Sequence, residues 1–396
     1  MTKASNRTIY LDNNATTQVA PEVVEAMQPF FGDQYGNPSS IHRFGGTVRK
    51  HIDRARDQVA ALIGADPAEI LFTSCGTESD NIAIQGVRSH HGNQTRILTS
   101  TVEHPAVRNV CRRLRERGTE VHEIGVDGEG LLDLDQVRAQ PLDKHTLLTF
   151  MWANNETGVI FPIEQLAEIA REHGCRLHTD AVQAVGKIPI DVGEVPIDYL
   201  ALSGHKLHAP KGVGALYVRK GAPFEPLMFG GHQEDGRRPG TENVPYIVGL
   251  GVACDLARRT IEEENTRVRK MRDRLEAELL AHCPGAKRNG HPTRRLPNTA
   301  NISFEFIEGE AILLLLDEEG VAASSGSACT TGSLEPSHVM RAMDIPYTLA
   351  HSSTRFSLSR YNTDEDIDTV VRAMPAIIER LRSISPYVAQ AGERRK

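Results

Sequence analysis

Short apolar runs alternate with amphipathic segments over the first half of the chain, and this alternation constrains the fold more than any other feature. The strand-like runs lie at residues 70–73, 96–99, 147–151, 176–179, 199–202 and 214–218. Segments with helical periodicity, such as residues 107–117 and 163–172, separate them, and an earlier amphipathic helix is expected from Thr47 to its end at Gly64. Because parallel strands need long crossover connections, the alternation predicts an α/β fold with a mostly parallel sheet. Binding loops are then expected at the carboxyl ends of the strands.

The length of the chain indicates two domains. At 396 residues it exceeds the size at which a single hydrophobic core usually stops growing. A charged helical pattern with a break, over about residues 244–281, marks the boundary. After it we expect strands at residues 300–306 and 354–358 and helices at residues 309–319, 337–343 and 364–383. The expected division is a large domain over residues 15–262 and a smaller α+β domain formed by residues 1–14 and 263–396.

Composition excludes several classes of function. A formal charge of −7, with 39% hydrophobic and 24% charged residues, gives no reason to expect nucleic acid or a membrane surface as a partner. The longest apolar run, at residues 311–316, is too short to span a bilayer, and residues 1–7 show no apolar leader. Six cysteines without close pairs argue against a disulfide framework and against an intrinsic zinc site. We therefore expect a cytoplasmic protein.

A lysine directly follows one of the apolar strands. Ser203-Gly204-His205-Lys206 comes after the run at residues 199–202. A lysine at this position can be desolvated enough to lose its proton and act as an amine nucleophile, while Ser203 and His205 donate to a phosphate. The combination indicates pyridoxal phosphate, bound as a Schiff base of Lys206. The alternative is a solvated surface lysine.

A second polar segment lies between a strand and an apolar helix. In the segment at residues 73–81, Gly76 permits close approach of a ligand to the backbone. The amides from Thr77 onward open a helix, and a helix N-terminus is a site for anions such as phosphate. The alternative is an ordinary helix start with Thr77 as its capping residue.

Polar side chains also follow three further strands. His104 can stack on a cofactor ring and move protons, or have a purely structural role. Asn155 offers an amide to cofactor or substrate, or belongs to a simple turn. Asp180 can keep a pyridine nitrogen protonated, with Gln183 one helical turn further on, or it caps a helix. Their convergence around Lys206 favours a cofactor site.

Two further candidates lie later in the chain. The glycine-rich segment at residues 229–243 is too polar for a core and places Thr241 as a further phosphate donor; a surface loop is the alternative. Arg355 follows a short strand pattern and suits bidentate capture of an α-carboxylate, with a surface ion pair as the alternative.

One cysteine lies among small residues that cannot bury it well. Cys329, within residues 322–333, is therefore expected to be a nucleophile that can move between sites. Cys75 competes for that role but lies where a helix start would fix it. The others are expected to be structural: Cys111, Cys175, Cys254 and Cys283.

Taken together, these motifs resemble the class V aminotransferase superfamily, which has pyridoxal-phosphate fold type I. Within it the chain is similar to the group I cysteine desulfurases of the NifS type. The resemblance runs from Tyr-Leu-Asp-Asn-Asn-Ala-Thr-Thr at residues 10–17 to Arg-Phe-Ser-Leu-Ser at residues 355–359. Its most specific part is Ser203-Gly204-His205-Lys206 together with Ser-Ser-Gly-Ser-Ala-Cys at residues 324–329, which ends at Cys329. Gly-His-Gln-Glu at residues 231–234 and Gly-Thr-Glu-Asn at residues 240–243 favour the NifS branch. The resemblance implies a large domain with a mostly parallel sheet and a smaller α+β domain.

The resemblance also implies roles for individual residues. Lys206 would hold the cofactor, Asp180 would pair with its pyridine nitrogen and His104 would stack on its ring. Gln183 and Asn155 would lie near the phenolic oxygen, and Asn155 and Arg355 would hold the substrate carboxylate. The phosphate would be bound by Gly76, Thr77, Ser203 and His205, joined by Thr241 from the other subunit of a homodimer. Asp235 departs from the pattern, which has arginine after Gly-His-Gln-Glu.

The implied activity is removal of sulfur from L-cysteine, which gives L-alanine and a persulfide on Cys329. Lys206 would remove the α-proton, His104 would assist reprotonation and the Cys329 thiolate would attack the substrate sulfur. An iron–sulfur scaffold protein, nitrogenase-related in the NifS branch, would accept the sulfur, with Cys329 as a transient ligand of a shared cluster. Two alternatives stay open: an aminotransferase or lyase of the same fold, and a sulfur-relay protein that uses Cys329 without catalysis.

Overall fold

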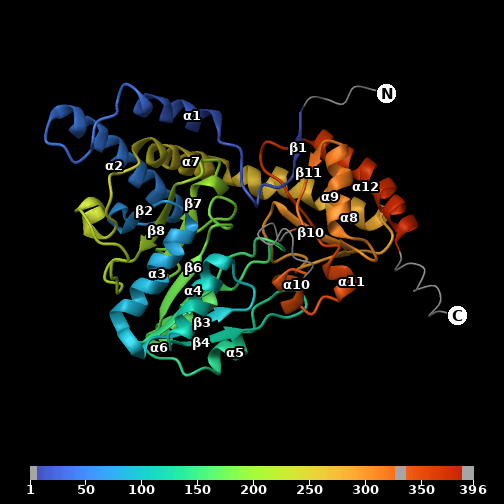
Figure 1. Ribbon diagram of the computed structural model, residues 1–396, viewed down its shortest axis with the longest axis horizontal. Coiled ribbons are helices and arrows are strands. Elements are labelled where there is room, and N and C mark those ends of the chain that lie inside the picture. Colours follow the sequence, from blue (N-terminus) through green and yellow to red (C-terminus); the bar gives the residue numbers. More distant parts are fainter. Residues whose placement is uncertain (1–6, 326–335, 386–396) are drawn as a thin grey trace.

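A seven-stranded sheet forms the centre of the molecule (Figure 1). The computed structural model describes residues 7–325 and 336–385. The strands lie in the order β2-β8-β7-β6-β5-β3-β4. Their bounds are β2 Ile70–Thr73, β3 Arg96–Ser100, β4 Glu120–Ile124, β5 Thr146–Thr149, β6 Arg176–Asp180, β7 Tyr199–Ser203 and β8 Gly214–Val218. In this sheet β8 runs opposite to the other six strands, so the prediction of a mostly parallel sheet is confirmed.

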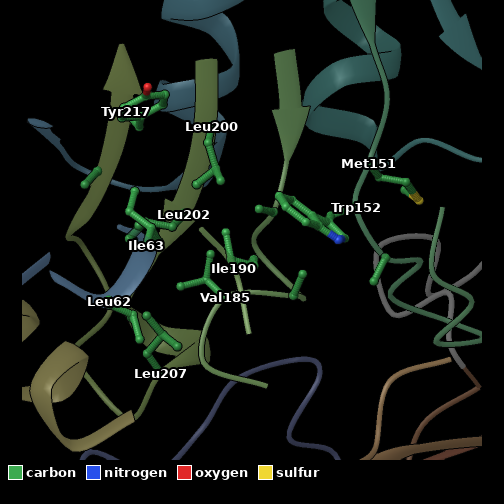
Figure 2. Packing of buried hydrophobic residues seen from close by; sticks show 14 of the residues in the cluster. Leu62, Ile63, Met151, Trp152, Val185, Ile190, Leu200, Leu202, Leu207 and Tyr217 are labelled. Atoms are coloured by element: carbon green, nitrogen blue, oxygen red, sulfur yellow. The ribbon is translucent and has the colours of Figure 1, made fainter. Parts of the chain in front are cut away.

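Helices cover the sheet because its strands are apolar on both faces. Every residue of β2, β5, β7 and β8 is buried. Figure 2 shows this packing from close by, with Leu200 and Leu202 of β7 in the same cluster as Leu62 and Ile63. The helices of this part are α1 Pro21–Met27, α2 Arg43–Ile63, α3 Gly76–His91, α4 Pro105–Glu116, α5 Leu134–Arg138 and α6 Ile163–His173.

Helix α2 begins earlier than its apolar pattern indicates. Its first residue is Arg43 rather than Thr47, because the side chain of His42 caps it by accepting a hydrogen bond from Gly45 N at 3.1 Å. Histidine is not among the usual capping residues, so the sequence carried no clear start signal. The end is as expected, at Gly64 with φ of +69°.

A helix with a break leads out of the central sheet. Helix α7, Val244–Glu263, is followed by a π-helical turn, Glu264–Val268, and by α8, Arg269–His282. The predicted break is thus a π-turn. In Figure 1 these elements connect the part that holds the seven-stranded sheet to the part that holds α9 and α12.

The C-terminal part packs around a three-stranded antiparallel sheet in the order β12-β10-β9. Its elements are β9 Ala286–Arg288, β10 Thr299–Phe304, α9 Gly309–Glu318, β11 Val321–Ala322, α10 His338–Ala342, α11 Tyr347–Ala350, β12 Thr354–Ser357 and α12 Asp364–Ile384. The N-terminal strand β1, Ile9–Tyr10, pairs with β11, so the start of the chain lies against this part. Within the ranges described, no helix combines the length and the apolar character needed to cross a membrane.

The buried apolar residues fall into separate clusters. One cluster contains Leu11 together with side chains from α8, α9 and α12. A larger one contains side chains from α1, α2, α6 and α7 against the seven-stranded sheet, and a third contains side chains from α3 and α4. Met340 and Ala350, which come late in the chain, belong to the larger cluster. The expected domain division at residue 262 stays a prediction.

Candidate active site

A cavity of about 320 Å³ lies where the carboxyl ends of the sheet strands meet. All predicted site residues other than Thr241 and Cys329 line it: Gly76, Thr77, His104, Asn155, Asp180, Gln183, Ser203, His205, Lys206 and Arg355. Most of them lie at or just after the carboxyl ends of strands in the parallel sheet, which brings them to one edge, whereas Arg355 comes from β12 of the three-stranded sheet. The expected convergence around Lys206 is therefore present in the structure.

Lys206 lies at the end of a short 3-10 turn that directly follows β7. Its Nζ donates hydrogen bonds to the backbone carbonyls of Ala15, at 2.7 Å, and of Asn14. Burial, followed by the nearby charges of Lys187 and Arg355, lowers the pKa of Lys206 to about 7. A large fraction of this amine is therefore uncharged at neutral pH, and the alternative of a solvated surface lysine is wrong.

The N-terminus of α3 and the loop after β7 form an anion cradle beside Lys206. A Cβ on Gly76 would lie 2.6 Å from Val182 Cγ2, so only glycine fits this close approach. Ser203 Oγ is buried and has no hydrogen-bond partner within the described residues. A phosphate group would supply that partner, and the first-turn amides of α3 would share its charge. The cradle therefore fits the phosphate of the expected cofactor.

Two details of this cradle differ from simple expectation. Helix α3 is capped by Cys75, so the alternative that Thr77 is the capping residue is wrong and Thr77 lies in the first turn. His205 Nδ1 lies 3.1 Å from Thr16 Oγ1. Burial and the charge of Lys206 lower the pKa of His205 to about 4, so His205 is a neutral hydrogen-bonding group at physiological pH.

Asp180 ends β6 and is held by its own backbone turn. Its Oδ1 accepts a hydrogen bond from Val182 N at 2.9 Å. Burial raises the pKa of Asp180, while His104 and Lys206 oppose that rise. A buried carboxylate of this kind gains most from a cationic partner, such as a protonated pyridine nitrogen.

Gln183 follows in a turn rather than one turn along a helix, yet it reaches the same cavity. Its Nε2 donates to Asn14 O at 2.9 Å. Its Oε1 is buried without a hydrogen-bond partner in the part of the chain described. An orphaned acceptor facing a cavity favours a ligand that carries a donor there.

His104 has a structural role and also lies at the cavity, while its expected stacking on a cofactor ring stays a prediction. It caps α4, since its Nδ1 accepts a hydrogen bond from Ala106 N at 3.2 Å, and it also lines the cavity. Burial lowers the pKa of His104. Because Nδ1 is an acceptor, the neutral ring carries its proton on Nε2.

Arg355 is held at the cavity by hydrogen bonds to Asp12 and Asn155. Its Nη2 donates to Asp12 Oδ1 at 2.7 Å and its Nη1 donates to Asn155 O at 2.8 Å. The side chain of Arg355 is only 2% exposed, so the alternative of a surface ion pair is wrong. The turn here is closed by Asn154, whose Oδ1 accepts from two following amides, and Asn155 lines the cavity.

Thr241 is exposed and does not line this cavity. Its expected contribution to the site of another subunit stays a prediction. The loop before it is anchored by Glu234, which pairs with Arg56 at 2.6 Å, and by Arg238, which pairs with Glu78 at 2.8 Å. Asp235 has φ of +57°, a left-handed conformation that aspartate adopts more readily than most residues. Arginine has no such preference, which gives the departure at Asp235 a physical reason.

Cys329 lies outside the described residues. The described chain leads up to it at Ser324, whose backbone exchanges hydrogen bonds with the backbone of Arg355 at 2.6 and 3.2 Å. Cys75 lines the cavity at the cap of α3. The cysteines expected to be structural are all buried: Cys111, Cys175, Cys254 and Cys283.

Sequence reasoning missed Asn14 and Asp80, which also line the cavity. Asn14 gives its backbone carbonyl to Lys206 and Gln183, and its side chain donates to Thr299 Oγ1 at 2.8 Å. Asp80 follows Gly76 by one helical turn, a spacing that could have placed it on the same face of α3.

Within the described ranges, no group of three or more histidine, cysteine or acidic side chains is arranged to hold a metal ion.

Comparison with known proteins identifies relatives over nearly the whole chain. The family model for aminotransferase class-V matches residues 9–370. A cysteine desulfurase of Trichormus azollae is 58% identical over 379 residues, covering 96% of this chain and 95% of the relative. The cysteine desulfurase NifS of Azotobacter vinelandii is 57% identical over 380 residues, covering 96% and 94%.

Solved structures of related proteins are also similar to this chain over most of its length. A NifS-like protein superposes with a TM-score of 0.89 at 37% identity, covering 94% of this chain and 100% of that chain. A structure titled SspA in complex with cysteine gives a TM-score of 0.78 at 36% identity, covering 89% and 99%.

Proposed function

Because the chain belongs to the class V aminotransferase family and is a pyridoxal-phosphate-dependent cysteine desulfurase, we propose a role in that reaction for each of its site residues. The substrate is L-cysteine, and the products are L-alanine and a protein-bound sulfur atom. The observation that carries the assignment of residues is the meeting of Lys206, Asp180 and His104 in one cavity. Ser203 Oγ and Gln183 Oε1 have no hydrogen-bond partner among the described residues, and this supports the assignment because the cofactor has groups that would satisfy both.

When bound, pyridoxal phosphate supplies an electron sink joined to the substrate α-carbon. Lys206 would hold it, and Asp180 would pair with its pyridine nitrogen. Its phosphate would be held by Gly76, Thr77, Ser203 and His205, with Thr241 contributed by the second subunit of a homodimer. The exposure of Thr241 outside its own cavity supports that last assignment, since an exposed hydroxyl is available to a neighbouring chain.

The protein groups then position and protonate the substrate. Arg355 and Asn155 hold the α-carboxylate, which fixes the α-proton near Lys206. The Lys206 amine is the base that removes this proton, and a pKa of about 7 suits a base at neutral pH. His104, whose Nε2 carries a proton in the neutral ring, returns a proton in this proposal.

Cys329 takes the sulfur. Its thiolate attacks the substrate sulfur, the Cβ–S bond breaks, and the bonding electron pair stays on Cβ, which gains a proton to give alanine. One S–S bond is formed, so Cys329 leaves the step as a persulfide. The chain reaches Cys329 from Ser324, which is hydrogen-bonded to the backbone of Arg355 at the cavity, and this connection supports the assignment.

The sulfur acceptor is proposed from the names of relatives. The relative from Azotobacter vinelandii carries the name NifS, and on this basis we infer an iron–sulfur scaffold protein of the nitrogenase type as the acceptor. Cys329 would then be a transient ligand of the shared cluster. A reducing compartment such as the cytoplasm suits this chemistry, because the described cysteines are all free thiols.

The products test the proposal against its alternatives. The full-length protein, loaded with pyridoxal phosphate, is incubated with L-cysteine and a thiol reductant, and alanine, sulfide, pyruvate and ammonia are measured. A desulfurase gives alanine and sulfide in equal amounts. Pyruvate with ammonia would indicate a lyase, alanine formed only with an added amino donor and keto acid would indicate an aminotransferase, and no turnover would leave a sulfur relay.

A further inference from the structure

A second and smaller cavity, of about 20 Å³, borders Lys206 as well. It is far too small for a cofactor or substrate. Its polar lining includes Lys187, Glu264, His208 and Arg360. These residues come from four separate segments of the chain, so only folding brings them to the same cavity as Lys206.

Lys187 is the most unusual of these residues. It is only 6% exposed, and its Nζ has no hydrogen-bond partner within the described part of the chain. Burial of an unpaired ammonium is costly, and it lowers the pKa of Lys187 to about 8. A lysine that served only to fill space could be replaced by a methionine without this cost, which favours an electrostatic role for Lys187.

Glu264, at the start of the π-turn between α7 and α8, lines the same small cavity as Lys187. Burial raises the pKa of Glu264 to about 7, and the charge of Lys187 opposes that rise. Asn265, the next residue, donates from Nδ2 to Lys187 O at 2.8 Å and so fixes the two segments together. A π-turn changes the direction of the side chains that follow it and is often found at functional sites.

We propose that Lys187 is a positioning residue for Lys206: in the buried interior beside Glu264, it keeps the ammonium charge on itself and leaves the Lys206 amine neutral to capture pyridoxal phosphate. The proposal rests on the proposed function, in which Lys206 holds the cofactor. Two ammonium charges beside one small cavity repel strongly in a low-dielectric interior, so only one of them is readily kept. Glu264 determines which one, because it acts on Lys187.

The surrounding charges agree with this assignment. After burial, Lys187 is the largest influence that lowers the pKa of Lys206, ahead of Arg355 on β12, whereas Asp12 and Asp180 raise it. Two other groups face Lys187 and Glu264. They are His208, whose pKa is lowered to about 4 by burial, and Arg360, which opposes the raised pKa of Glu264.

The rate of cofactor capture as a function of pH tests the proposal without measuring turnover. The full-length protein is freed of cofactor, pyridoxal phosphate is added, and the rise in visible absorbance is followed between pH 5.5 and 9.5. The rate requires the neutral amine, so its midpoint reports the pKa of Lys206. The variants are Lys187→Met, Lys187→Arg and Glu264→Gln, and the matched control is Lys211→Met, which removes a lysine that is exposed to solvent.

The midpoint should move up by about one pH unit in Lys187→Met, because a like charge nearby is lost. It should stay near the wild-type value in Lys187→Arg and Lys211→Met. Glu264→Gln should also move it up, by a smaller amount, since Lys187 then loses charge. A direct effect of Glu264 on Lys206 would move it down, so the direction in Glu264→Gln separates the two explanations.

Each outcome either supports or overturns the inference. An unmoved midpoint in folded Lys187→Met, an equal shift in Lys211→Met, or a downward shift in Glu264→Gln would overturn it. Should circular dichroism show that Lys187→Met is unfolded, the direction of the midpoint shift in Glu264→Gln alone tests the inference. Lys206→Ala separates this inference from the proposed function: normal capture by that variant would defeat the proposed function itself, whereas capture that needs Lys206 but ignores Lys187 defeats only the inference.

Discussion

Arg355 donates a hydrogen bond from Nη1 to the backbone carbonyl of Asn155 at 2.8 Å, which fastens strand β12 to the turn after β5 across the cavity. The same guanidinium is held by Asp12 Oδ1 at 2.7 Å. These contacts and the near absence of exposure hold the guanidinium in place. A fixed guanidinium is what bidentate binding of an α-carboxylate requires. The placement of the substrate therefore depends on contacts between segments that are far apart in sequence.

Arg355→Lys should weaken substrate binding while leaving the cofactor in place. Lysine keeps the charge but loses the planar fork, and the loss of one charged hydrogen bond costs about 1.5–3 kcal/mol. We expect the KM for L-cysteine to rise about tenfold or more, measured by sulfide release, with the visible absorbance of the bound cofactor unchanged. Arg274→Lys, which alters an exposed ion pair with Asp368, is the control and should leave KM unchanged. Equal KM values in wild type and both variants would remove Arg355 from the substrate site.

Lys206→Ala should lose turnover and the visible absorbance of bound cofactor. Both depend on the side-chain amine, and the loss of a catalytic base alone costs about 10²–10⁴-fold in rate. The fold should be kept, because the hydrogen bonds of Lys206 end on backbone carbonyls at the edge of a cavity. Absorbance spectra, sulfide release and thermal unfolding check these three points. Lys211→Met is the control, and wild-type turnover in Lys206→Ala would show that another amine holds the cofactor.

Cys329→Ala should still bind pyridoxal phosphate and L-cysteine but should carry no persulfide and release no alanine at a useful rate. The thiolate that attacks the substrate sulfur is absent, whereas the residues of the cavity are untouched. Mass spectrometry after brief exposure to L-cysteine should find one added sulfur on the wild-type peptide that contains Cys329. Cys75→Ser is the matched control, since Cys75 is the described cysteine that lines the cavity. Sulfur on the Cys75 peptide, or full activity of Cys329→Ala, would make Cys329 a bystander.

Glu103→Gln should change how stability depends on pH. Burial raises the pKa of Glu103 from 4.5 to about 8, although Ser100 Oγ and Met151 N donate hydrogen bonds to its Oε1 at 2.6 and 3.0 Å. Between these two pH values the folded state binds more protons at this site than the unfolded state. The free energy of unfolding therefore falls as pH rises from about 4.5 to about 8.

Glutamine stays neutral and keeps the accepting oxygen, so that fall should be reduced in Glu103→Gln. Denaturant unfolding should give similar values for variant and wild type near pH 5, and a more stable variant near pH 8. Glu116→Gln, at an exposed ion pair, should follow the wild type at both pH values. A variant that is less stable than wild type at pH 8 would show that the ionised carboxylate is the form the fold prefers.

The sequence was informative where local pattern and chemistry coincide. Apolar runs of strand length separated by helical periods give a mostly parallel sheet, because crossover connections leave few alternatives. Such a sheet collects its loops at one edge, so the pattern alone predicts that polar residues after separate strands, such as His104, Asp180 and Lys206, meet there. Capping was less predictable: His42 and Cys75 begin helices without being usual capping residues.

Only the tertiary structure determined the electrostatics and the second layer of the site. Asn14 accepts hydrogen bonds from Lys206 and Gln183, although neither lies near it in the sequence, because strand pairing brings the start of the chain back to the cavity. Lys187 and Glu264 are separated along the chain and carry no motif, yet a π-turn and a buried cavity place them beside Lys206. The sequence by itself identified the reactive groups that follow the strands, such as Lys206, Asp180 and His104. Their protonation depends on burial and on charges from distant segments, and no local pattern encodes either of these.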